Sequence, residues 1–364
     1  MKYLIKNIST VKRGSSPRPI INYIVKEGYP WLKISDFKFG DREVYETKEF
    51  IKPEGLKNTR YVKKGTLIVT NSATPGIPIF LGNDMCLHDG FLFFEKLNHD
   101  IVDIKYLYYY LLANRDKLMA KGNGSIFINL KKEILENYEI DIPSMQIQQH
   151  IVDTIGSIDD LIESIKCKID KLNEILMNLF DKLPLVNGNK FYDIFTTMNG
   201  GTFSSKDYLE HSNEKLITIK NINSEGFDSS SPTYFKYNEK YEKYRLNIGD
   251  ILLTMTGAYL GRSGIVDDEN CFLNQRVLKV SSVSNAFTYC FLQKNKDNIF
   301  NLGKGSAQQN LGLKELACFD VNYSTETIKE FTNYDLFIDN IVKYKITIRK
   351  LNNIKQIYLK KFFG

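Results

Sequence analysis

Apolar residues recur at alternating steps of four and three positions near the middle of the chain, with mostly polar and charged residues between them. The pattern holds for about four heptads, which is the spacing of a helix that packs along one seam against a second helix. We therefore predict a long helix over residues 146–184. Its seam residues are Ile151, Ile155, Ile158, Ile162, Ile165, Ile169, Leu172, Leu176 and Leu179.

A second heptad pattern occupies the end of the chain and predicts a helix over residues 325–364. Its seam residues are Tyr334, Phe337, Ile341, Tyr344, Ile348, Leu351 and Tyr358, with Lys355 interrupting the pattern. The first helix carries three more acidic than basic residues, and the second carries four more basic than acidic ones. Each helix could cover only its own domain. Two sustained seams, on helices of opposite net charge, instead favour two helices packed against each other. Each helix leaves from the same end of its own domain copy, so we predict that the pair is antiparallel.

Short apolar runs bounded by glycine predict buried strands in the segments that precede the two helices. Leu67–Val69 and Ile251–Leu253 are runs of this kind. Helices are predicted near residues 104–120 and 285–301, the first ended by glycines. Residues 183–189 contain proline, glycine and asparagine, which predict a linker.

The two halves of the chain repeat one another, because residues near 8–180 return as a diverged copy near 194–360. Gly65-Thr66-Leu67 returns as Gly249-Asp250-Ile251, and the offset drifts only from 186 to 179 along the chain. Solenoid repeats are much shorter, at roughly 20–50 residues, so this is a duplicated domain. The predicted fold is α+β: two tandem mixed α/β domains, each followed by a long helix, with the helices packed as an antiparallel coiled coil of pseudo-twofold symmetry. The predicted limits are 1–145, 146–184, 185–324 and 325–364.

Charge and cysteine usage narrow the class of protein. Residues 1–145 carry five more basic than acidic residues, whereas 185–324 are balanced. A nucleic-acid partner fits the first segment, although ordinary soluble domains carry similar charge. No apolar run reaches the roughly 18 residues of a membrane span. The five cysteines are scattered without a CxxC pair, which indicates a reducing cytoplasm and neither a disulfide framework nor a metal site.

Familiar catalytic motifs are absent from the sequence. It contains no GxSxG, HExxH, Walker or GxGxxG pattern, and no Asp/Asn-Pro-Pro-aromatic tetrapeptide of a DNA amino-methyltransferase. We therefore predict no catalytic residues and no cofactor bound by this chain.

Polar, glycine-rich segments occur at matching places in both copies. The pairs are 12–18 with 198–206, 70–76 with 254–262, and 122–129 with 303–310. Such segments serve as turns in many proteins. Their hydroxyl, amide and backbone N–H groups also suit DNA phosphates, and arginine, asparagine and glutamine suit base edges.

The residues that we predict to contact DNA come from these segments and from a short stretch of the second copy. They are Lys12, Arg13, Ser15, Ser16, Arg18, Ser72, Thr74, Asn123, Ser125, Asn129, Ser205, Lys206, Thr256, Tyr259, Arg262, Gln275, Arg276, Lys304, Ser306, Gln308 and Gln309.

The ordered set of these features resembles the specificity (S) subunit of type I restriction–modification enzymes. The residues that carry the resemblance are Lys12-Arg13-Gly14-Ser15-Ser16-Pro17, Tyr29–Asp36, Gly65–Ser72, Gly124-Ser125, Ile140-Asp141-Ile142-Pro143 leading into Ile158–Glu163, and Leu273-Asn274-Gln275-Arg276. The second copy departs from the pattern, with Tyr323-Ser324 where a proline is expected before its long helix.

The resemblance implies a non-catalytic subunit with two target-recognition domains, each reading one half of a bipartite double-stranded DNA site. It also implies that the two helices fix the spacing and dock modification (methyltransferase) subunits, two of them. S-adenosylmethionine would belong to those subunits, and ATP-dependent cleavage to restriction subunits. A coiled-coil adaptor with duplicated protein-binding domains is the alternative, and a nucleic-acid enzyme ranks third.

Overall fold

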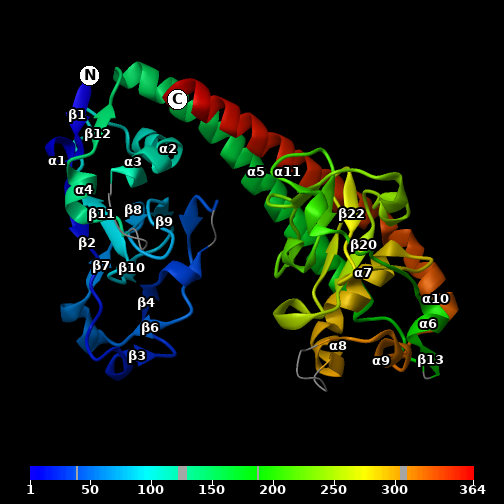
Figure 1. Cartoon of the computed structure of the whole chain (residues 1–364). Coiled ribbons are helices and arrows are strands. Elements are labelled where there is room, and N and C mark those ends of the chain that lie inside the picture. The colour runs from blue at the N-terminus through cyan, green and yellow to red at the C-terminus, as the bar shows by residue number, and fades with distance from the viewer. Residues whose placement is uncertain (38–39, 122–128, 187, 304–309) are drawn as a thin grey trace. The chain divides into compact units, whose positions relative to one another are not determined.

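The computed structural model describes residues 1–37, 40–121, 129–186, 188–303 and 310–364 (Figure 1). Its internal contacts divide the chain into two compact units. Unit 1 consists of Met1–Asp160 and Asn352–Gly364, and unit 2 of Leu161–Leu351. Each unit is described by itself.

Unit 1 contains two five-stranded sheets and one pair of strands. The first sheet has the order β2 (Thr10–Arg13), β11 (Phe91–Glu95), β8 (Leu67–Thr70), β9 (Pro78–Leu81) and β5 (Glu43–Val44). The second has the order β3 (Ile24–Val25), β6 (Phe50–Ile51), β4 (Tyr29–Leu32), β10 (Met85–Leu87) and β7 (Arg60–Val62). β1 (Lys2–Leu4) pairs with β12 (Glu139–Asp141). The predicted buried strand Leu67–Val69 lies in the middle of the first sheet, and its side chains are fully buried.

Unit 2 repeats this plan. One sheet has the order β14 (Thr196–Asn199), β23 (Val277–Ser281), β20 (Ile251–Thr254) and β21 (Ser263–Ile265). The other has the order β15 (Tyr208–Leu209), β19 (Thr233–Phe235), β16 (Lys215–Ile217) and β22 (Cys271–Leu273). β13 (Asn189–Lys190) pairs with β24 (Asp320–Val321), and β17 (Ile222–Asn223) with β18 (Gly226–Phe227). β16 pairs with β22 in parallel as β4 pairs with β10, so the sequence repeat is also a structural one.

The short helices cover the sheets of their own unit. In unit 1 they are α1 (Ile5–Ile8), α2 (Ile104–Ala113), α3 (Arg115–Ala120) and α4 (Lys132–Glu136). In unit 2 they are α6 (Phe191–Ile194), α7 (Asn285–Lys294), α8 (Lys296–Leu302), α9 (Leu313–Ala317) and α10 (Thr325–Glu330). Short 3-10 segments include η3 (Pro53–Asn58), η4 (Ser205–Asp207), η6 (Glu239–Tyr244), η7 (Gly257–Tyr259) and η9 (Phe331–Tyr334).

The single helices predicted over 104–120 and 285–301 are wrong, because each is interrupted by an asparagine. Asn114 separates α2 from α3, and its Nδ2 donates to the carbonyl of Tyr110 at 3.0 Å. Asn295 separates α7 from α8 and donates in the same way to Phe291 at 3.0 Å. A side-chain amide that bonds to the preceding turn competes with the regular helical hydrogen bonds.

Two long helices follow the repeated segments. The first is α5 (Met145–Phe180). The second, α11 (Asp335–Phe363), is shorter than the predicted 325–364, because α10 and η9 come before it. Ser324 caps α10 by accepting a hydrogen bond from the N–H of Thr327 at 3.0 Å, and the buried Phe331 follows in η9.

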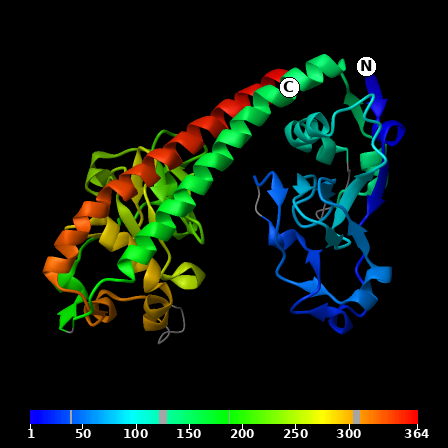
Figure 2. The same ribbon diagram turned by 180° about the vertical axis from the view of Figure 1, so that it is seen from behind.

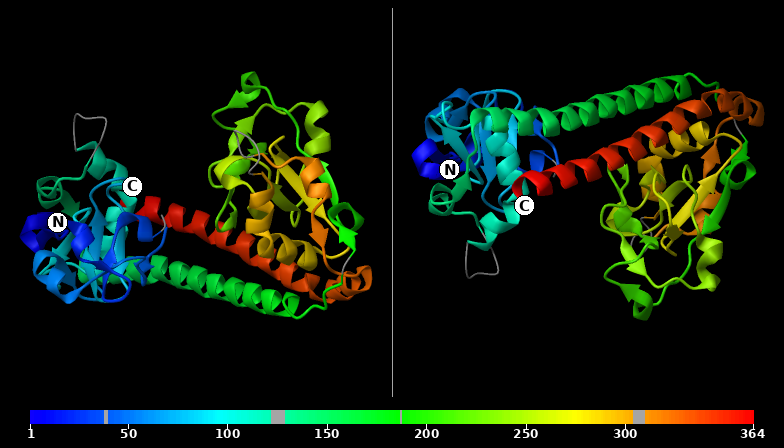
Figure 3. Two further views of the ribbon diagram at one scale, coloured as in Figure 1. Left: turned by 90° about the horizontal axis from the view of Figure 1, so that it is seen from below. Right: turned by 90° about the horizontal axis from the view of Figure 1, so that it is seen from above.

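Within each unit the two long helices lie side by side and run in opposite directions (Figure 2 and Figure 3). In unit 1, the rings of His150 and Phe362 lie 6.1 Å apart, and Asp159 bonds to Lys355 at 2.7 Å. The residue numbers on α11 thus fall as those on α5 rise, as antiparallel packing requires. Ile151, Val152 and Ile155 share one hydrophobic cluster with Leu359 and Phe363.

In unit 2, the same two helices share a second hydrophobic cluster. Its members from α5 are Ile165, Ile169, Leu176 and Phe180, and those from α11 are Ile338, Ile341 and Val342. Every predicted seam residue is buried or half-buried. The heptad geometry of a coiled coil itself stays a prediction.

Candidate nucleic-acid interface

In unit 1 the segment after β2 packs tightly against the turn between β10 and β11. A Cβ atom on Gly14 would lie 2.0 Å from the carbonyl oxygen of His88, so the two backbones meet at a point where only glycine fits. The N–H groups of Gly14 and Ser15 donate to Phe91 at 2.9 Å and Leu87 at 3.0 Å. The predicted contact residues of this segment therefore share one surface with the turn His88–Gly90.

Asp89 connects several of these residues. Its backbone carbonyl accepts a hydrogen bond from Arg13 Nε at 2.8 Å. Its carboxylate accepts one from Ser16 Oγ at 3.0 Å and lies 3.5 Å from the guanidinium of Arg18. Because 78% of the Arg18 side chain is exposed, that guanidinium remains accessible to a ligand.

The protonation states of Asp89 and His88 follow from their surroundings. Burial acts to raise the pKa of Asp89, but the Ser16 hydrogen bond and the charges of His88, Arg13 and Arg18 outweigh it and lower the pKa. Burial is the main cause that lowers the pKa of His88. His88 Nδ1 accepts the N–H of Gly90 at 2.9 Å, so we place its proton on Nε2, 3.0 Å from the Asp89 carboxylate.

A polar pocket adjoins this network. Its lining residues are Ser15, Ser16, Arg18, Lys57, Asn58, Thr59 and Arg60. Ser15 Oγ donates to the carbonyl of Asn58 at 2.9 Å, and Thr59 Oγ1 donates to that of Ser15 at 2.7 Å. The exposed side chains of Lys57 and Arg60 make no hydrogen bond or ion pair with any residue that the structure describes.

Lys57 and Arg60 were missed by sequence reasoning. They lie 39 and 42 positions after Arg18, the end of the first glycine-rich segment, and the pairing of β7 with β10 and the Ser15 bonds to Asn58 and Thr59 bring them beside it. A signal was present in the Lys57-Asn58-Thr59-Arg60 stretch, which has two cations around an amide and a hydroxyl.

The other predicted residues of unit 1 are more scattered. Lys12 forms an ion pair with Glu95 at 2.7 Å. Ser72 lies beside Gly90, since a Cβ there would be 3.2 Å from Ser72 Oγ. Thr74 is exposed, and its carbonyl accepts a hydrogen bond from Thr70 at 2.7 Å. Asn129 is exposed, whereas Asn123 and Ser125 lie outside the described residues.

Unit 2 builds the same surface with other side chains. A Cβ on Gly200 would lie 2.1 Å from the carbonyl oxygen of Asn274, as at Gly14 and His88. Thr202 Oγ1 donates to Gln275 Oε1 at 2.9 Å. Gln275 and Arg276 are exposed, and the Arg276 guanidinium has no partner among the described residues.

The remaining predicted residues of unit 2 lie on two short elements or beyond the described ranges. Ser205 and Lys206 are exposed on η4. The Arg262 guanidinium lies 4.7 Å from the ring centroid of Tyr259. Thr256 forms an isolated backbone bridge with Asn310. Lys304, Ser306, Gln308 and Gln309 lie outside the described residues.

Equivalent backbone hydrogen bonds bring the segments together in both units. In unit 1, the Asn71 N–H donates to Gly90 at 2.9 Å, and the Asn71 carbonyl accepts from Leu130 at 2.9 Å. In unit 2, Met255 makes the same two bonds, to Arg276 at 3.0 Å and from Leu311 at 2.9 Å. The first two predicted segments of each copy, and the leucine that follows the third, therefore meet at one place, beyond β8 or β20.

Each of these places holds a buried polar atom with no hydrogen-bond partner. In the part of the chain that the structure describes, Asn71 Oδ1 and Thr256 Oγ1 are such atoms.

One equivalent pair of arginines shows that the two surfaces differ chemically. Arg60 opposes Leu87, and Arg245 opposes Phe272 at the matching place. Arg245 forms two bonds to the Glu242 carboxylate, at 2.6 and 3.0 Å, and its guanidinium lies 4.5 Å from the Phe272 ring. The first arginine is thus available to a ligand, whereas the second is engaged within its own unit.

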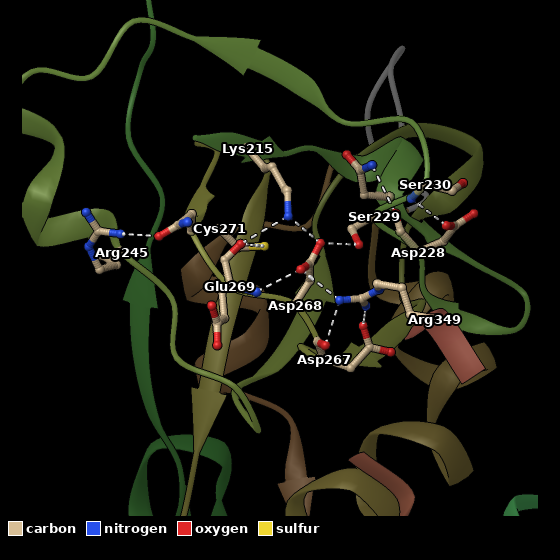
Figure 4. Close-up of polar contacts among 12 residues, drawn as sticks. Lys215, Asp228, Ser229, Ser230, Arg245, Asp267, Asp268, Glu269, Cys271 and Arg349 are labelled. Carbon is tan, nitrogen blue, oxygen red and sulfur yellow. Dashed lines mark hydrogen bonds and ion pairs between the residues drawn. The ribbon is translucent and has the colours of Figure 1, made fainter. Parts of the chain in front are cut away.

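In unit 2 a polar network connects α11 to the chain just before β22, the strand that leads to the Asn274–Arg276 turn (Figure 4). Arg349 NH1 donates to the carbonyl of Asp267 at 2.8 Å and lies 2.8 Å from the Asp268 carboxylate. The other Asp268 oxygen accepts from Lys215 at 2.7 Å and from Ser229 at 2.7 Å. Asp267 and Asp268 come just before β22, so this network holds the beginning of the strand that leads to the Asn274–Arg276 turn.

The structure also bears on other kinds of site. No described helix is both long and apolar enough to cross a membrane. Outside the residues left undescribed, no cluster of histidine, cysteine and acidic side chains could hold a metal ion.

Comparisons with known proteins agree with one another. The family model described as "Type I restriction modification DNA specificity domain" matches residues 1–174 and 189–324. The type I restriction enzyme MjaIX specificity subunit of Methanocaldococcus jannaschii is 30% identical over 186 residues, covering 48% of this chain and 41% of that protein. The MjaVIII specificity subunit of the same organism is 24% identical over 297 residues, covering 73% and 67%. The chain thus spans less than half the length of the first of these relatives.

A solved structure shares the fold. The type I restriction–modification S subunit from M. genitalium aligns with 100% of this chain and 96% of its own, with a TM-score of 0.62 at 16% identity. Two tandem mixed α/β domains with long helices are therefore an arrangement that this chain has in common with a known structure.

Proposed function

The chain belongs to the family of type I restriction–modification DNA specificity domains, and we propose that it is the DNA-recognition subunit of such an enzyme. Each unit would read one half of a bipartite double-stranded target. One observation carries the proposal: the same backbone contacts join the first two glycine-rich segments to one turn, His88–Gly90 or Asn274–Arg276, in both units, while the exposed side chains differ. A protein that reads two different half-sites needs one frame with two sets of contacts.

The exposed groups of each surface suit different parts of DNA. In unit 1, Arg18, Lys57 and Arg60 offer positive charge around a pocket of hydroxyl groups, which suits phosphates. In unit 2, Gln275 and Arg276 carry the side chains that make paired hydrogen bonds to adenine and guanine edges.

Partner subunits supply the chemistry in this proposal. We expect two modification subunits to carry S-adenosylmethionine and the methyl transfer, and restriction subunits to carry ATP-dependent cleavage. The long helices leave apolar side chains exposed for docking. These are Met145, Ile147, Leu161 and Ile175 on α5, and Leu336, Ile354 and Ile357 on α11. Ile147, Leu161 and Ile175 recur at two-heptad intervals, which places them along one side of α5. The complex would act in the cytoplasm, on the DNA of the cell.

The test measures the affinity of the full chain for duplex DNA, alone and with modification subunits, at several salt concentrations. The chain alone should bind weakly and lose affinity steeply with salt, because its contacts are largely to phosphates. Modification subunits should tighten binding and confer preference for one sequence. A coiled-coil adaptor that binds other proteins would bind neither DNA nor modification subunits. That result would exclude the proposed function.

A further inference from the structure

A buried polar contact joins the two long helices within unit 1. Lys355 Nζ donates to Asp159 Oδ1 at 2.7 Å, and the hydroxyl of Tyr109 donates to Asp159 Oδ2 at 2.8 Å. The three residues are only 8%, 6% and 2% exposed. Tyr109 belongs to α2, Asp159 to α5 and Lys355 to α11, so three elements meet at this one carboxylate.

The N-terminal part of the α5 seam discriminates only weakly between registers. Its positions 151, 155, 158, 162, 165 and 169 are all isoleucine. If α11 slid by one heptad toward the C-terminal end of α5, Leu359 would face Ile162 in place of Ile155, and Phe363 would face Ile158 in place of Ile151, so these apolar contacts would be preserved. Uniform seams of this sort leave register poorly defined, and a polar residue within the seam is a common means of fixing it.

The polar contact does discriminate between registers. After a slip of one heptad in one direction, Lys355 would face Val152, and Asp159 would face Ile348. After a slip in the other direction, Lys355 would face Lys166, and Asp159 would face Phe362. Either slip leaves a buried carboxylate and a buried ammonium group without each other, which is strongly unfavourable.

We infer that Asp159 and Lys355 select the register of the antiparallel helix pair, with Tyr109 orienting the carboxylate. The residue that interrupts the heptad pattern of α11 is therefore its register-determining residue. Tyr109 extends the selection to the domain that carries α2, because the same carboxylate must also meet its hydroxyl. The inference concerns the helix pair and stands whether or not the chain binds DNA.

Disulfide formation between introduced cysteines tests the register directly. The background is the full chain with its exposed thiols replaced, Cys167→Ser and Cys318→Ser. Cysteines at 155 and 359, two positions buried in one cluster, report the native register. Cysteines at 155 and 352 report a slip of one heptad in one direction, and cysteines at 158 and 363 a slip in the other.

With the polar contact intact, we expect the native pair to oxidise at least about tenfold more than either slipped pair. The variant Asp159→Leu, Lys355→Leu, Tyr109→Phe keeps the helices apolar and should form the slipped disulfides to within a few-fold of the native one. Exchange of the two charges, Asp159→Lys with Lys355→Asp, should restore the native preference. Asp160→Asn is the matched control, because the neighbouring carboxylate is 69% exposed and should not affect register.

Two outcomes would overturn the inference. One is slipped disulfides in the intact chain at a level close to the native one. The other is exclusive native pairing in the leucine variant whose helix content, followed by circular dichroism, is unchanged. If the leucine variant loses its helix content, the charge-exchanged variant decides: a native preference there supports selection by the ion pair, and its absence contradicts it. None of these experiments measures DNA binding, so the test of register remains valid even if the proposed function is wrong.

Discussion

Gly14 approaches the backbone carbonyl of His88 so closely that a Cβ atom would lie 2.0 Å from its oxygen. The contact joins the first glycine-rich segment to the turn that carries Asp89. Gly200 and Asn274 repeat it in unit 2, so it belongs to the frame that both units share.

Gly14→Ala should therefore lower the free energy of unfolding of unit 1 by about 1–3 kcal/mol, the usual range for overpacking. Trp31 is the single tryptophan of the chain and is buried in unit 1, so its fluorescence in urea reports that unit. An unchanged midpoint would mean that the two backbones can separate without cost.

Gly156→Ala should have the opposite effect. Gly156 lies in the interior of α5, and the nearest atom to its missing Cβ is the Tyr109 hydroxyl at an ordinary 3.7 Å. Alanine should stabilise unit 1 by about 0.5–1 kcal/mol through helix propensity. The same tryptophan fluorescence measures it, and the variant is the matched control for Gly14→Ala. A lower midpoint would show that the added methyl group does not fit beside the Tyr109 hydroxyl.

The lowered pKa of Asp89 predicts a pH dependence. Its native carboxylate binds a proton less readily than the unfolded one, whose pKa is near 3.8. The contribution to stability is thus complete above that value and is lost as the pH falls through the lower, native pKa. Urea unfolding from pH 6 to pH 3 should show a steeper loss for the wild type than for Asp89→Asn. Parallel curves would show that Asp89 contributes nothing through its charge.

The two equivalent arginines should respond differently to removal. Arg60→Ala should weaken DNA binding and reduce the slope of log affinity against log salt by about one phosphate contact, with little change in stability. Arg245→Ala should instead lower the melting temperature, because it frees Glu242 and uncovers Phe272. Anisotropy titrations and thermal unfolding of both variants test the contrast. Equal effects on DNA binding would show that the engagement of Arg245 does not matter.

Much of the fold is visible in local sequence. The heptad steps of α5 and the buried run Leu67–Val69 each depend on residues close together in the chain, and the repeat between the halves follows from comparing two sets of such local stretches. Local patterns of this kind follow from helix and strand geometry, which fixes which side chains share a face. The interruptions at Asn114 and Asn295 escaped prediction, because the helical pattern continues on both sides of each asparagine.

The sequence alone determined the duplication and the long helices, because spacing and residue type record them directly, and it predicted the segments that suit DNA. Only the tertiary structure showed that Lys57 and Arg60 join the first of those segments, and that Arg245 is engaged where Arg60 is not. It also showed that Lys355, which interrupts the apolar seam in the sequence, is the buried partner of Asp159. Each of these facts depends on residues far apart in the chain, and the pairing of strands and helices that brings them together is not written in any local pattern.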